Sequence, residues 1–245
     1  MAISYSTEAY DISNLPASSG WYNIKLSTGN VTTYIDNSYD GGGWILVMQN
    51  RRYTGGMNNL TYSDAINQCN YRTEPSSNNS TNTKVGGPKA GDSLANYNVF
   101  IGLKHWSALA GRVTSGYITV VQYAAASNGV SLTGTHSERW RWRFTGFNST
   151  YAMQGAGSIG GEGGTTTPPG MYSYHAANAF NLTTYDNDQD TNGGNCATYY
   201  NNNPFWYGSC WSGNWFAGGG GYVDAPYWTS SDSANQRQFG AVYIK

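Results

Sequence analysis

The chain has 245 residues, which is long enough for one large domain or two small ones with a real core. Its net charge is −1 and it has no basic tract, so an extended phosphate-binding surface for nucleic acid is not expected. No apolar run of about 18 residues occurs, which excludes an ordinary membrane-spanning helix.

The composition favours turns and short strands over a helical bundle, with 32 Gly, 21 Tyr and 9 Trp. Tyr and Trp suit half-buried surfaces and binding sites as well as cores. The first residues, MAISYSTEAY, have neither a basic nor an apolar segment of signal-peptide type. We therefore expect a processed or engineered start, or another route out of the cell, such as release of a virion by lysis.

The first half of the chain reads as strands with one short helix. Strands are predicted at 19–26 (SGWYNIKL) and 41–52 (GGGWILVMQNRR). Residues 61–72 (TYSDAINQCNYR) predict a short helix with Ser63 as its cap. From Thr73 to Asn98 the composition predicts a long surface loop.

The second half contains further strands and then becomes irregular. Strands are predicted at 98–106 (NVFIGLKHW), 115–127 (SGYITVVQYAAAS) and 138–147 (ERWRWRFTGF). In the last of these, alternation predicts aromatic side chains on one face and arginines on the other. Gly155–Gly170 predicts a flexible loop, and the chain is loop-rich and aromatic-rich from His175 onward.

These patterns predict an α+β fold, with a central twisted antiparallel sheet, short helices and a loop-rich C-terminal third. We expect one domain over 1–245, with an N-terminal part at 1–52, a central sheet at 53–174 and a site-bearing region at 175–245.

An acidic loop stands out in a chain that is only 11% charged. Asp186, Asp188 and Asp190 alternate in TYDNDQDTNGGNC, a spacing that calcium loops use to direct oxygens at one ion. The EF-hand template fails, because Thr191 stands where glycine is needed and Ala197 where glutamate is needed. A different Ca²⁺ loop is the favoured interpretation; the alternative is an exposed turn whose Asp and Asn side chains cap backbone donors.

Three cysteines are present. Cys196 and Cys210 would close a short loop of a natural size for a disulfide. The chain has no CxxC pair and its histidines are far apart in sequence, so zinc is not expected. Cys69 is left over and reads as a buried thiol.

The segment FNLTTYDNDQDTNGGNCATYY with FWYGSCWSGNW resembles the C-terminal part of the fibrinogen-related domain family, which includes ficolins and tachylectins. Earlier stretches are similar to the same family: YDISNLPASSGWYNI, IDNSYDGGGWILVMQNRR and FIGLKHW. The likeness runs from about Tyr10 to the end and is closest between Phe180 and Trp211. Intelectin-type lectins share the GGW opening, but the acidic loop is more like the fibrinogen type.

The resemblance implies a Ca²⁺ site. Asp188 and Asp190 would give side-chain oxygens, Asn192 and Gly194 main-chain carbonyls, and Asp186 outer support. It also implies a Cys196–Cys210 bridge and a cis peptide at Ser209–Cys210, which would aim backbone groups into a pocket for acetylated sugars or other acetyl groups.

Two family features are missing. Ala9 or Tyr10 and Thr33 stand where the first disulfide is expected, and Trp211 stands where histidine often follows the second cysteine. These departures affect acetyl specificity more than they affect fold or calcium. The residues expected to form the ligand pocket are Tyr199, Trp206, Ser209, Cys210, Trp211, Tyr227 and Trp228.

The favoured function is a calcium-stabilised carbohydrate-binding module that acts in extracellular or cell-surface recognition, as a lectin, adhesin or viral receptor-binding protein. The alternative is a structural virion or matrix protein that uses the fold for assembly. We expect the protein to act outside the cell or on a virion surface and to bind a glycan or another acetylated ligand. We also expect that it can form a homo-oligomer. No catalytic set is recognisable, so an enzyme is not expected.

Overall fold

The computed structural model describes residues 9–51, 59–67, 71–73, 98–109, 116–125, 138–163, 165–210 and 239–245. Within these ranges no helix is long and apolar enough to cross a membrane.

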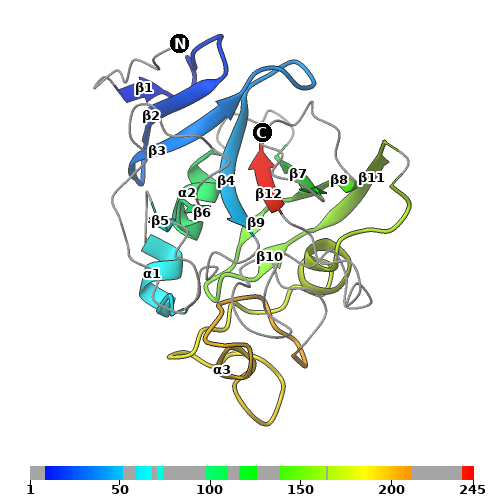
Figure 1. Ribbon diagram of the computed structural model, residues 1–245. Coiled ribbons are helices and arrows are strands. Elements are labelled where there is room, and N and C mark those ends of the chain that lie inside the picture. Colours follow the sequence, from blue (N-terminus) through cyan, green and yellow to red (C-terminus); the bar gives the residue numbers. More distant parts are fainter. Residues whose placement is uncertain are drawn as a thin grey trace.

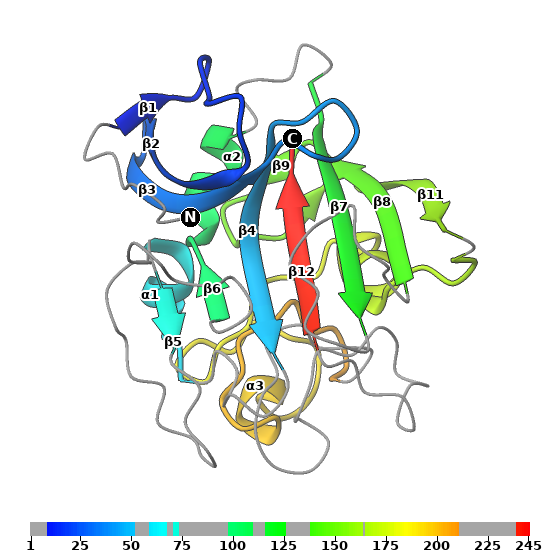
Figure 2. The ribbon, with the colours of Figure 1, turned by 45° about the horizontal axis from the view of Figure 1, so that its top comes forward.

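One mostly antiparallel sheet dominates the described residues (Figure 1). Its main path runs β1-β2-β3-β4-β12-β7-β8-β11, and only β1 pairs in parallel, with β2. The strands of this path are β1 (Ala9–Asp11), β2 (Gly20–Leu26), β3 (Gly29–Asp36), β4 (Trp44–Arg51), β12 (Phe239–Ile244), β7 (Ile118–Ala125), β8 (Glu138–Phe144) and β11 (Gly157–Glu162). The last strand in sequence, β12, lies between β4 and β7 in the middle of the sheet (Figure 2).

The alternation in β8 has the predicted consequence. Trp140, Trp142 and Phe144 are buried, whereas the arginines between them are half-buried or exposed. Aromatic rings on one face therefore contribute to the core, because successive side chains of a strand point to opposite sides of the sheet.

The arginine face of β8 binds the turn before β4. Arg141 forms ion pairs with Asp40 at 3.1 Å and Glu162 at 3.0 Å, and its guanidinium donates to the Tyr39 hydroxyl at 2.7 Å. Arg139 pairs with the same Glu162 at 2.7 Å. These charges explain the basic strand without a nucleic-acid partner, since they link three distant segments of the chain.

The remaining elements are short. They are α1 (Tyr62–Asn67), β5 (Tyr71–Thr73), β6 (Asn98–Phe100), α2 (Leu103–Leu109), β9 (Gly146–Phe147), β10 (Met153–Gln154), the π-helical turn η3 (Met171–Ala176) and α3 (Cys196–Tyr199). Of these, β6 pairs with β4 and with β5 and extends the same sheet, whereas β9 and β10 pair with each other. The α+β fold expected from the sequence is thus confirmed, with a central, mostly antiparallel sheet and few, short helices.

Three local predictions were wrong. The strand predicted to continue through 103–106 is the helix α2, which buries Leu103, Trp106 and Leu109 at a spacing of three residues. The loop predicted over Gly155–Gly170 contains β11, because pairing with β8 supplies partners that composition does not reveal. The cap of α1 is Thr61, whose hydroxyl accepts the Asp64 N–H at 3.0 Å, and not Ser63. The loop predicted over Thr73–Asn98 lies almost wholly outside the described residues, as does Cys69.

Candidate functional site

A disulfide joins α3 to the loop around residue 210. In the view of Figure 2, α3 lies below the lower ends of β4 and β12. Cys196, the first residue of α3, is bonded to Cys210, so the predicted bridge is confirmed. Further contacts hold the acidic loop to the same segment: Thr191 donates its backbone N–H to the Gly208 carbonyl at 2.9 Å, and the Asn192 amide contacts the Cys210 sulfur at 3.3 Å. The acidic loop therefore lies directly against the bridge.

Side chains of the acidic loop accept backbone N–H groups two residues further along. Asp188 accepts from Asp190 at 3.3 Å, Asp190 accepts from Asn192 at 2.9 Å, and Asn192 accepts from Gly194 at 3.3 Å. These are the capping bonds of the alternative interpretation. They fix the orientation of the Asp188, Asp190 and Asn192 side chains relative to the loop backbone.

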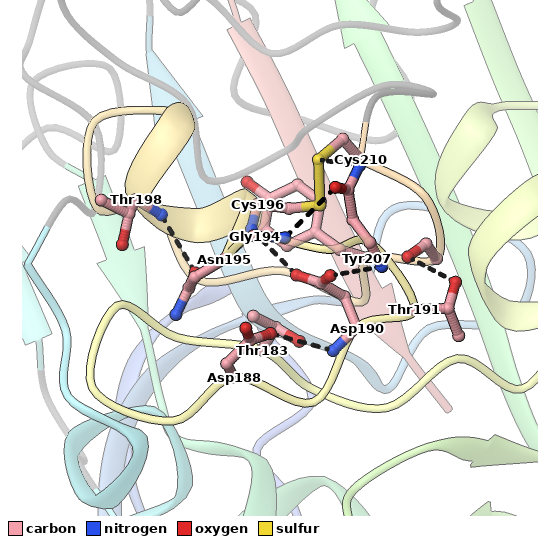
Figure 3. The surroundings of a disulfide bond; sticks show 12 residues. Thr183, Asp188, Asp190, Thr191, Gly194, Asn195, Cys196, Thr198, Tyr207 and Cys210 are labelled. Carbon is pink, nitrogen blue, oxygen red and sulfur yellow. Dashed lines mark hydrogen bonds between the residues drawn. A yellow bond between two sulfur atoms is a disulfide. The ribbon is translucent and has the colours of Figure 1, made fainter.

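Asp190 occupies the centre of this arrangement, between the disulfide and Asp188 in the view of Figure 3. Its second oxygen accepts the Cys196 N–H at 2.9 Å, at the start of α3. Burial raises the pKa of the Asp190 carboxyl and the negative charge of Asp188 raises it further, although the N–H groups of Cys196 and Asn192 oppose the shift. Two carboxylates held close together favour the arrival of a positive charge.

The donors of this loop fit a hard cation. Asp188 and Asp190 offer carboxylate oxygens, and Asn192 and the glycines beside it add amide and main-chain oxygens, the ligand types that Ca²⁺ prefers. A bound cation would offset the repulsion between the two carboxylates and hold the loop against α3. The roles of the Asn192 and Gly194 carbonyls as ligands stay predictions.

Asp186 was expected as outer support of the site and not as a direct ligand, and that role stays a prediction. Its carboxylate accepts the Tyr62 N–H at 2.9 Å, at the first residue of α1, and the Thr184 hydroxyl at 2.6 Å. No three acidic, histidine or cysteine side chains of the described residues come together as a metal-binding group, so Asp186 does not join Asp188 and Asp190. It joins the acidic loop to α1.

Trp206 was expected in the wall of a ligand pocket, and this expectation is wrong. Its side chain is fully buried and its ring nitrogen donates to the Tyr151 carbonyl at 2.7 Å. Its ring stacks on Phe147 at 6.4 Å between centroids and lies 6.3 Å from that of Trp106. Trp206 therefore belongs to the core.

Tyr199 has the exposure that a ligand-stacking residue needs, at 70%. It ends α3, three residues after the bridging Cys196, and its ring lies over Gly194, where an added Cβ would approach the hydroxyl to 2.7 Å. Ser209 is exposed and Cys210 half-buried on the other side of the disulfide. The structure thus brings Tyr199, the acidic loop and the 209–210 segment together, whereas Trp211, Tyr227 and Trp228 lie outside the described residues.

The cis peptide expected at Ser209–Cys210 is wrong, because no described peptide bond is cis. Cys210 instead has a positive φ of 66°, which is uncommon for a residue with a side chain.

Tyr185 was not anticipated as a surface residue. It is 37% exposed and precedes Asp186 directly. In the sequence, the signal for an exposed tyrosine here is its position directly before the acidic loop.

Comparisons with known proteins agree on one fold. Residues 122–234 match the family model of the fibrinogen beta and gamma chains, C-terminal globular domain. No curated protein matches the chain by sequence alone.

Similar solved structures include the fibrinogen-like globe domain of human ANGPTL6, with a TM-score of 0.57 and 19% identity, covering 94% of this chain and 89% of that one. The corresponding domain of human ANGPTL2 has a TM-score of 0.55 and 18% identity, with coverage of 94% and 93%. Lamprey fibrin D-dimer, in complex with the peptide Gly-His-Arg-Pro-amide, has a TM-score of 0.62 and 14% identity, with coverage of 95% and 70%.

Proposed function

We propose that the chain is a fibrinogen-related domain that acts as a calcium-stabilised carbohydrate-binding module. Its fibrinogen C-terminal-like fold and the match to the family's sequence over residues 122–234 support the first part. Domains of this family often act in extracellular recognition and are generally binding modules rather than enzymes. The proposal adds the ion, the ligand class and a place outside the cell or on a virion surface.

The observation that carries the proposal is the position of the acidic loop between a disulfide and an exposed aromatic ring. Asp188 and Asp190 present carboxylates next to each other, and Asp190 also binds the start of α3. An ion at this pair would order the loop and α3 together, and with them Tyr199, which ends that helix.

Carbohydrate suits the exposed part of this surface. A tyrosine ring that is 70% exposed offers a flat apolar face for the C–H groups of a sugar, and nearby hydroxyl and amide groups satisfy its polar edges. Exposed Thr191, Asn192 and Ser209 supply such groups around the disulfide.

The calcium part is tested by thermal and urea unfolding in Ca²⁺ and in chelator. A Ca²⁺ concentration about 100 times the Kd is expected to add about 2.7 kcal/mol to the free energy of unfolding. The Asp188→Asn variant should lose this gain. Asp186→Asn is the matched control, because it removes a carboxylate that binds α1 and should lower stability while leaving the response to Ca²⁺ intact.

The ligand part is tested on a glycan array that includes acetylated sugars, with and without Ca²⁺. Binding that requires Ca²⁺ and is lost in Asp188→Asn supports the proposal. A peptide panel belongs in the same experiment, since the similar lamprey structure holds a peptide. Binding of peptides alone would replace carbohydrate as the ligand class, and no binding at all would contradict the proposal.

Assembly without glycan binding is the second candidate function. The observation that favours it is β11, a strand at the end of the sheet path with Ile159 52% exposed. Light scattering behind size-exclusion chromatography separates the two, because a stable oligomer unaffected by Ca²⁺ and by glycans favours assembly.

A further inference from the structure

Asn192 and Gly193 form an exposed Asn-Gly step in the acidic loop. Asn192 is the only asparagine followed by glycine among the residues that the structure describes, while Asn128–Gly129 lies outside them. Apart from the two neighbouring residues in the chain, no atom lies within 4 Å of the position that a Gly193 side chain would take. Since glycine has no side chain there, none hinders attack by its backbone nitrogen.

The Asn192 side chain is held beside the peptide that follows it. Its Oδ1 accepts the Gly194 N–H at 3.3 Å, which polarises the side-chain carbonyl and would stabilise negative charge developing on that oxygen. Its Nδ2 contacts the Cys210 sulfur at 3.3 Å, and its own N–H donates to Asp190. The electrophilic carbon is thus placed next to the glycine that carries the attacking nitrogen.

We propose that Asn192 is a site of spontaneous deamidation. The Gly193 nitrogen, after loss of its proton to solvent base, attacks Asn192 Cγ and forms a C–N bond. The Cγ–Nδ2 bond then breaks and ammonia leaves with a proton from solvent. Water opens the resulting succinimide at either carbonyl, and the product is aspartate or isoaspartate at position 192.

The reaction changes the loop in two ways. A new carboxylate appears two residues from Asp190, whose pKa is already raised by burial and by Asp188. The amide contact to the Cys210 sulfur is lost at the same time. Without a cation, the new carboxylate at position 192 and that of Asp190 repel each other. With a cation, the new carboxylate is an additional anionic ligand. Isoaspartate also adds one carbon atom to the backbone at position 192.

The experiment incubates the full chain at mildly alkaline pH and follows amide-to-acid conversion by peptide mapping, with isoaspartate detected by an isoaspartyl methyltransferase. Asn192 is expected to convert several-fold faster than Asn148, because the side chain of Ser149 hinders attack by its own nitrogen whereas glycine has no side chain. Asn148 is the matched comparison, since its Oδ1 also accepts the N–H two residues further along, from Thr150. Asn192 remaining an amide while Asn128 converts would overturn the proposal.

Gly193→Ala is the matched variant, because the space around Gly193 admits a methyl group. It should fold normally and slow conversion at position 192 several-fold while leaving the Asn128 rate unchanged. Equal rates in the two proteins would also overturn the proposal.

The effect on cation binding rests on the proposed function and is measured separately, by Ca²⁺ titration of the Asn192→Asp variant against the wild type. A several-fold gain in affinity is expected. If neither protein binds Ca²⁺, the calcium proposal fails. The deamidation proposal is still decided by the conversion rates at Asn192.

Discussion

The central sheet and the region over 180–210 are stabilised by different means. In the sheet, strands such as β4 and β8 pair along their length and bury alternate or continuous apolar side chains. In the region 180–210, isolated bridges at Thr183–Phe205 and Thr184–Asn187, one disulfide and a series of side-chain-to-backbone hydrogen bonds take their place. The sheet thus depends on apolar burial, whereas the site depends on a few specific polar and covalent contacts.

Trp206 lies where the two regions meet, and replacing it should lower the free energy of unfolding more than any other change considered below. Trp206→Ala is expected to cost about 3–5 kcal/mol of unfolding free energy, since it empties a fully buried site among Phe147, Trp106 and Phe205. Urea unfolding measures this loss. Trp206→Phe is the control that keeps a ring but loses the bond to the Tyr151 carbonyl, and it should cost less. A stable Trp206→Ala protein that merely lost ligand binding would restore Trp206 to the site.

Loss of the disulfide should weaken the site region alone. The Cys196→Ala/Cys210→Ala double variant is expected to lose about 3 kcal/mol, because the bridge closes a loop with a sequence separation of 14. Hydrogen exchange should rise first in α3 and the acidic loop and leave β4 and β12 protected. Exchange that rises equally in the sheet would remove the distinction between the two regions.

His105 should make the sheet side sensitive to acid. It is buried in α2, its Nδ1 lies 2.9 Å from the Thr28 hydroxyl, and burial lowers its pKa from 6.5 to about 4. Between these values the unfolded chain binds a proton that the native protein does not, so stability falls as pH decreases from about 6.5 to 4. The expected loss is about 3 kcal/mol.

Urea unfolding at pH 7 and near pH 4 measures the loss at His105. His105→Gln should remove this component and leave only the contribution of the carboxyl groups. An unchanged pH dependence in that variant would show that the imidazole is not the group responsible. Asp190 should contribute the opposite pH dependence. Because the pKa of its carboxyl is raised in the folded protein, the free energy of unfolding of the cation-free protein falls as pH rises through the titration of that group.

Tyr199→Ala should have the smallest effect on folding. A side chain that is 70% exposed contributes within about 0.5 kcal/mol, so the melting temperature should hardly change. Glycan binding should nevertheless weaken, while Tyr199→Phe retains it because the ring remains. Undiminished binding by Tyr199→Ala would place the ligand elsewhere.

Local patterns in the sequence determined much of the fold. The alternation of Trp140, Trp142 and Phe144 predicted strand β8, because side chains two residues apart share a face whatever lies around them. The cysteine spacing and the family likeness identified the bridge and the position of the acidic loop beside it. These features depend on residues near one another in the chain.

Only the tertiary structure decided which residues of the irregular region face inward. Trp206 and Tyr199 are both aromatic residues of that region, yet contacts with Phe147 and Tyr151 bury the first while the second ends a helix at the surface. Asp186 binds α1 and not the other aspartates, because Tyr62 arrives from 124 residues away. In a segment without regular periodicity, orientation is set by such distant partners, and they have no signature in the local sequence.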